Sequence, residues 1–170
     1  MNIIGISLGN VCYSAQWGVE NNLRKTKIEG YNTCPFDLMA SNYDGIVKCI
    51  KEDFQNFCNT DCLVLNNNDL YNTYYGFGFN HESPYHADIY LTENWAEGPY
   101  HFINNNYAHF IERYNKRIQS FKNYLNDPNN YIVFIIQFRA HLPPDDLNSL
   151  KSVLFEKYPN LKYEIKVIPL

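Results

Sequence analysis

Apolar residues in this chain form short uninterrupted runs near both ends and helically spaced sets between them. The runs at 3–8, 131–138 and 163–168 are rich in β-branched residues, which predicts three strands. The run 131–138 is continuous, as in a parallel strand covered by helices on both faces. A helix beginning at 143–146 connects the last two strands by a right-handed crossover. The pattern predicts an α/β fold, layered, with a mostly parallel central sheet flanked by helices.

Three more stretches have the spacing of helices. Residues 11–24 follow the first strand, and a second helix opens at 41–44, with apolar positions continuing to Phe57. The longest predicted helix spans 107–125 and carries one apolar stripe. It ends before Asp127 because a proline follows, and proline cannot continue a helix.

The middle of the chain alternates between aromatic and small or polar residues. This alternation predicts a strand over 71–81, with its buried aromatic residues and His81 on one face. Shorter strands are predicted at 62–65 and 87–91. His81 is therefore expected at the end of a strand.

Composition and charge exclude several classes of protein. The 170 residues suffice for one domain spanning 1–170, and 45% hydrophobic content excludes a disordered chain. The net charge of −4 leaves no basic surface for nucleic acid or an anionic membrane, and no apolar run is long enough to span a bilayer. With no signal peptide visible, a cytoplasmic location is expected. The many residues with A/T-rich codons, including 24 asparagines, suit a low-GC bacterium or a large DNA virus.

The five cysteines indicate free thiols rather than disulfides. Their number is odd and their density low, as in proteins of a reducing compartment. Cys58 and Cys62 are four residues apart, but no second cysteine pair or histidine follows at the spacing of a zinc finger. We therefore expect neither a metal nor another cofactor.

Cys12 is the first candidate for chemistry. It follows the first predicted strand and the turn Gly9-Asn10, at or near the start of a helix. Free backbone N–H groups and the helix dipole at such a position favour a thiolate. The same N–H groups, with the side-chain amide of Asn10, would hold an oxyanion during acyl transfer. The alternative is a small apolar residue that packs the turn, and the sequence leaves both open.

His81 is the candidate base for such a thiol. A nucleophilic cysteine needs an imidazole within hydrogen-bond reach, and the end of a strand can provide it. The alternative is a half-buried histidine bonded to the backbone, and His86 and His101 are other candidate bases in predicted loops. His109 shares a helical ridge with Arg113 and Arg117, which we interpret as a solvated face.

Five segments of the chain, taken in order, resemble the motifs of a known family. They are Ser7–Cys12 (SLGNVC), Cys34–Asp37 (CPFD), Phe79–His81 (FNH), Tyr114–Phe121 (YNKRIQSF) and the strand Ile132–Phe138. The order resembles that of a poorly characterised family of putative papain-like cysteine peptidases. The resemblance covers nearly the whole chain.

The resemblance implies roles for individual residues. Cys12 would be the nucleophile and His81 the general base. Arg117 matches the helix arginine of the family, which has no defined role. Independently of the resemblance, Gly9 and Asn10 are placed in the oxyanion and substrate-binding group, to which Arg117 is added. No particular peptide, acyl or glycan substrate and no oligomeric state is implied.

Three carboxylates are candidates for the third catalytic residue. Asp37 lies in the matching CPFD segment and would orient the base or order its loop. Glu82 and Asp88 are the other two, and the choice stays open. The chain departs from the family pattern at Leu38, where tryptophan is expected, and at Glu82-Ser83 after the histidine. Papain-like enzymes also place their histidine on an antiparallel sheet, whereas a parallel sheet is predicted here.

The leading hypothesis is a cysteine hydrolase, either peptidase or acyl transferase. A non-catalytic module that binds carbohydrate or protein is the alternative, since exposed aromatic rings stack on sugars and fill interfaces. A third possibility is an esterase with Ser7 as nucleophile and His141 as the late histidine. The aromatic residues of the binding-module hypothesis are Tyr71, Tyr74, Tyr75, Tyr85, Tyr90, Trp95 and Tyr100.

Overall fold

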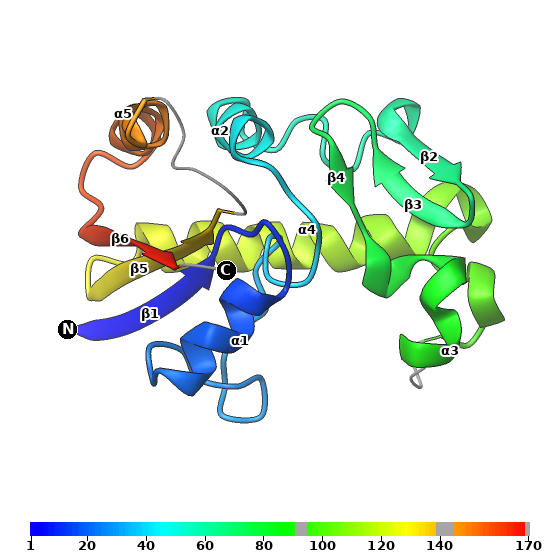
Figure 1. Cartoon of the computed structure of the whole chain (residues 1–170), viewed down its shortest axis with the longest axis horizontal. Coiled ribbons are helices and arrows are strands. Elements are labelled where there is room, and N and C mark those ends of the chain that lie inside the picture. Colours follow the sequence, from blue (N-terminus) through cyan, green and yellow to red (C-terminus); the bar gives the residue numbers. More distant parts are fainter. Residues whose placement is uncertain (91–94, 139–144, 169–170) are drawn as a thin grey trace.

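The computed structural model describes residues 1–90, 95–138 and 145–168. Its central sheet contains β1 (Asn2–Ser7), β5 (Asn130–Gln137) and β6 (Tyr163–Ile168), in the order β1-β5-β6 (Figure 1). Both strand pairs are parallel. The mixed α/β fold with a parallel sheet and flanking helices is therefore confirmed.

Helices cover both faces of this sheet, which explains the continuous apolar run of β5. On one face Val133 and Ile135 pack against Trp17 of α1, and on the other Ile132 and Phe134 belong to the main core. Figure 1 shows α1 on one side of the sheet and α2, α4 and α5 on the other. The helices are α1 (Tyr13–Glu20), α2 (Tyr43–Lys51), α4 (Asn104–Asn126) and α5 (Asn148–Lys157).

The predicted helices are confirmed, although three are shorter than expected. Helix α1 covers only part of 11–24, and α5 begins at Asn148 instead of at 143–146. The Asn42 side chain caps α2 by accepting a hydrogen bond from Gly45 N at 2.7 Å. This helix ends at Lys51, so Phe54 and Phe57 lie beyond it. Positions 143 and 144 of the last predicted helix lie outside the described residues.

A second, antiparallel sheet was not predicted. It contains β2 (Leu63–Asn66), β3 (Asp69–Asn72) and β4 (Phe77–Gly78). The prediction of one strand over 71–81 is wrong, because Asn72 Oδ1 accepts hydrogen bonds from two following backbone N–H groups, at 3.0 and 2.9 Å, and turns the chain.

The segment after β4 is helical rather than extended. His81 lies in a short 3₁₀ helix (Asn80–Glu82) directly after the antiparallel sheet. The strand predicted over 87–91 is also wrong, since Ala87–Tyr90 forms the short helix α3, and position 91 lies outside the described residues.

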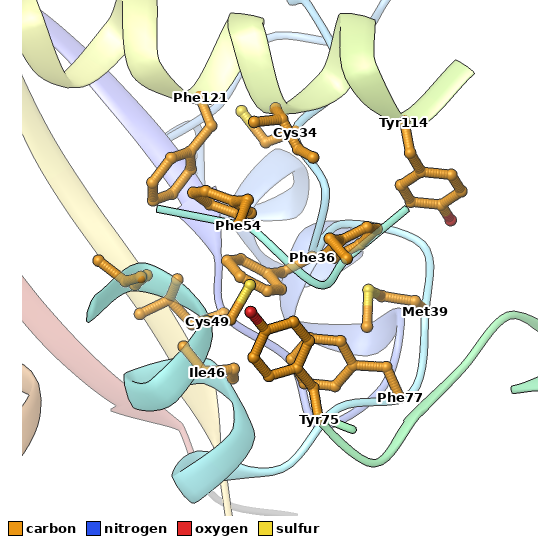
Figure 2. Close-up of a cluster of buried hydrophobic side chains, with 14 of the residues drawn as sticks. Cys34, Phe36, Met39, Ile46, Cys49, Phe54, Tyr75, Phe77, Tyr114 and Phe121 are labelled. Atoms are coloured by element: carbon orange, nitrogen blue, oxygen red, sulfur yellow. The ribbon is translucent and has the colours of Figure 1, made fainter. Parts of the chain in front are cut away.

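One aromatic core joins the two sheets. Phe36 lies at its centre, with ring centroids 5.8 Å from Phe54, 5.9 Å from Phe77 and 5.9 Å from Phe121. Figure 2 shows these rings gathered between α4 and α2. Because α4 contributes to this core along its length, it holds the antiparallel sheet beside the parallel one.

Candidate active site

The turn between β1 and α1 places Cys12 at the start of the helix. Gly9 has a φ of +93°, a conformation that favours glycine, and a Cβ there would collide with Ser41 Oγ. Cys12 is the residue just before α1, and its backbone is already helical. The predicted position of Cys12 at a helix N-terminus is therefore confirmed.

Hydrogen bonds hold this turn against the end of β5. Gly9 O accepts from Ser14 Oγ at 2.6 Å and from Gln137 N at 3.0 Å. Asn10 Nδ2 donates to Gln137 O at 2.6 Å, and Gly9 N donates to Ser7 Oγ at 3.1 Å. The N–H of Gly9 and one of the two N–H groups of the Asn10 amide are thus already engaged.

The structure brings Cys12 and His81 together. Cys12 Sγ lies 3.3 Å from His81 Nε2, although the residues are 69 positions apart in sequence. Both side chains are half-buried. The Tyr90 ring of α3 stacks on the imidazole with its centroid 3.9 Å away. We call Cys12 and His81 the dyad. The sequence did not indicate the contact with Tyr90, because residues 87–91 were predicted to form a strand.

Burial shifts the pKa values of both residues of the dyad. It raises the pKa of the Cys12 thiol above the usual 9.0, and the backbone N–H of Cys12 offsets this only in part. Burial also lowers the pKa of His81 below the usual 6.5. Burial therefore opposes the thiolate that the helix N-terminus is expected to favour, and it also opposes the imidazolium.

Glu82, next to His81, has its side chain directed to α4 instead of to the imidazole. Its fully buried carboxylate accepts hydrogen bonds from Arg113 at 3.0 Å, Arg117 at 3.2 Å and the Tyr114 hydroxyl at 3.1 Å. We call these four residues the Glu82 network. The expectation of a solvated arginine ridge is wrong, because both arginines pair with a buried acid. The network holds the turn that carries His81 against α4, which gives Arg117 a role.

Asp37 orders a loop and forms no hydrogen bond with His81. Its carboxylate accepts from Arg24 at 2.8 Å, from the Tyr31 hydroxyl at 3.0 Å and from Cys34 N at 2.7 Å. Asp88 is exposed on α3. Asp37, Glu82 and Asp88 all lie in the described part of the chain, and none of them forms a hydrogen bond with His81.

Other candidates lie in the core or outside the described residues. Ser7 is fully buried, its hydroxyl faces Phe36 O at 3.5 Å, and its proposed partner at position 141 lies outside the described residues. Of the aromatic residues, Tyr75 and Trp95 are buried in the core. Those at least 39% exposed are Tyr71, Tyr74, Tyr85 and Tyr100.

Within residues 1–90, 95–138 and 145–168, one group of side chains has the spacing of metal ligands: Glu97, His101 and His109. Cys58 and Cys62 do not belong to this group. No helix in these ranges is long and apolar enough to cross a membrane.

The fold and the dyad together define a class of protein. A thiol at a helix N-terminus paired with a histidine that follows an antiparallel sheet is the arrangement of papain-like cysteine enzymes, here beside a parallel sheet. The chain belongs to the family described as "Putative papain-like cysteine peptidase (DUF1796)", which matches residues 4–169. Neither a curated protein nor a solved structure matches the chain significantly.

Proposed function

We propose that this protein is a cysteine hydrolase or acyl transferase with Cys12 as nucleophile and His81 as general base. The observation that carries the proposal is the 3.3 Å separation between Cys12 Sγ and His81 Nε2. A base must come within hydrogen-bond reach of the proton that it removes, and this pair meets that condition. Membership of a family described as papain-like peptidases supports the same reaction class.

Burial opposes the charged forms of both Cys12 and His81, so proton transfer accompanies attack. Cys12 Sγ forms a bond to the substrate carbonyl carbon while its proton moves to His81 Nε2. The tetrahedral intermediate then expels an amine or alcohol, which takes that proton from His81. Water attacks the resulting thioester with His81 again as base, and the acid product leaves as the proton returns to the thiol. In acyl transfer, an acceptor amine or alcohol replaces the water.

The start of α1 supplies donors for the oxyanion of the intermediate. The backbone N–H groups of the first residues of a helix have no partner within it, so those at Cys12 and Tyr13 are available. The second N–H of the Asn10 amide is a further donor, because the contact with Gln137 O uses only the first. Gly9 contributes the shape of the turn rather than a hydrogen bond to substrate.

Site-resolved alkylation of the cysteines tests the dyad without a known substrate. Iodoacetamide labelling of Cys12 would be followed by peptide mass spectrometry between about pH 5 and pH 10. Because His81 assists deprotonation, we expect Cys12 at pH 7.5 to react about 100-fold faster in the wild type than in His81→Ala. The His86→Ala variant is the matched control, and Cys62 is the control thiol within each sample.

The same experiment has an outcome that contradicts the proposal. Equal Cys12 labelling rates in the wild type and in folded His81→Ala would show that the imidazole does not activate the thiol. A panel of peptide, ester and thioester substrates then identifies the acyl group. Turnover that survives in Cys12→Ser, with Cys62→Ser as control, would also exclude Cys12 as nucleophile.

A further inference from the structure

Two histidines and a glutamate converge at the N-terminal end of α4, away from the residues assigned to catalysis. Glu97 and His101 come from the segment before α4, and His109 from the helix itself. One ligand atom from each lies within 4.8 Å of the other two. The sequence did not indicate this group, because its members are four and eight residues apart across an irregular segment.

The contacts within the group hold the three side chains close together. His109 Nε2 lies 3.0 Å from Glu97 Oε1, and the two imidazole rings stack with centroids 4.0 Å apart. The second carboxylate oxygen of Glu97 accepts a hydrogen bond from Asn104 Nδ2 at 3.3 Å. Such an outer hydrogen bond is typical of a carboxylate ligand, since it sets the orientation of the carboxylate.

A simple ion pair explains only part of this arrangement. Glu97 and His109 form a pair, but His101 is 94% buried beside them. Among the described residues, the only hydrogen bond of its imidazole is a long one, 3.4 Å from Glu97 N to Nδ1. The nearby positive charge of Arg113 is balanced by Glu82, 3.0 Å away. A bound cation would give the buried imidazole a strong partner.

We propose that Glu97, His101 and His109 bind a divalent transition-metal ion, with zinc as the best match. Two imidazoles and one carboxylate are ligands that zinc prefers, and they leave one tetrahedral position for water. Ligand atoms around tetrahedral zinc lie about 3.3 Å apart, so rotation of the side chains from their present separations would complete the site.

The surroundings allow the ion to enter and define its role. A cavity of about 640 Å³ is lined in part by His101 and His109, which gives the open coordination position access to solvent. The ion would join the segment 97–101 to α4 at His109. Arg113 of the Glu82 network lies one helical turn further along α4, so the metal stabilises the helix end that supports His81. The dyad supplies no ligand.

Metal titration of the full chain tests the proposal. Metal-free protein would be titrated with zinc by calorimetry and with cobalt by visible absorption. We expect one zinc ion per chain, a higher melting temperature with zinc, and a cobalt spectrum without the near-ultraviolet band of thiolate ligands. Glu97→Gln and His109→Ala should each weaken zinc binding by about tenfold or more, while His86→Ala, a histidine outside the group, should bind as the wild type does.

Several outcomes would overturn the metal site, and none depends on enzymatic activity. Failure to bind one equivalent of zinc would do so, as would equal affinities in the wild type, Glu97→Gln and His109→Ala. Binding that is lost in Cys12→Ser would assign the ion to the dyad instead. The two test positions have side chains 36% exposed, so both variants should fold, and circular dichroism verifies this.

Discussion

Replacement of Glu82 by glutamine tests the network that holds the His81 turn against α4. The change keeps the size of the side chain but removes its negative charge. The carboxylate is fully buried, whereas Arg113 and Arg117 are 23% and 11% exposed. An amide has one oxygen, so it cannot accept the three hydrogen bonds of the carboxylate. In Glu82→Gln both guanidinium groups lose their partner in a poorly solvated site.

The magnitude follows from the burial of the network. Removing one partner of a buried ion pair costs about 3–5 kcal/mol, because it leaves an uncompensated buried charge. Arg113 is partly hydrated and recovers some solvation, so we expect the lower part of this range, about 3 kcal/mol. For a chain of this size each kcal/mol lowers the melting temperature by about 2–4 °C, which gives a decrease of roughly 6–12 °C.

Thermal and urea unfolding followed by circular dichroism measure this difference. The matched control is Glu112→Gln on α4, whose carboxylate is 64% exposed and pairs with exposed Lys116. We expect no measurable change in that variant, because exposed pairs contribute little. A melting temperature of Glu82→Gln equal to that of the control would refute the reasoning, since a buried carboxylate holding two arginines cannot be removed at no cost.

Other predictions concern the turn, the core and the pH dependence of stability. Gly9→Ala should lower the urea midpoint more than Gly30→Ala, because both have positive φ but only the first meets another side chain; equal losses would contradict the close contact. Phe36→Ala should destabilise by about 3–5 kcal/mol, measured by urea unfolding, and Phe155→Ala, a 74% exposed position, by far less. The pKa of His81 is lowered on folding, so its contribution to stability is complete above pH 6.5 and is lost as the pH falls below that value. The urea midpoint should therefore fall less between pH 7.5 and 5.5 in His81→Ala than in the wild type; an equal fall would show that His81 is not buried in its neutral form.

The elements that the sequence predicted correctly depend on local patterns. The continuous apolar run of β5 and the apolar stripe of α4 can be recognised from the sequence alone. A strand buried on both faces has consecutive apolar residues, whereas a helix buried on one face has apolar residues every three or four positions. The place of Cys12 was predictable because a strand, a glycine turn and a helix follow one another within 20 residues. Alternation misled in residues 71–81, where the side chain of Asn72 turns the chain and Gly76 has a φ of +71°.

The sequence by itself determined the parallel α/β framework, the position of a thiol at a helix start and the candidate histidine. Only the tertiary structure decided that these two meet, because 69 residues and a second sheet separate them. It also decided the direction in which the pKa of Cys12 is shifted, since burial is the largest contribution and raises it. The roles of Asp37, Glu82 and Arg117 depend on partners far away in sequence. No local sequence pattern determines which buried carboxylate pairs with which arginine, because the packing of the core decides this.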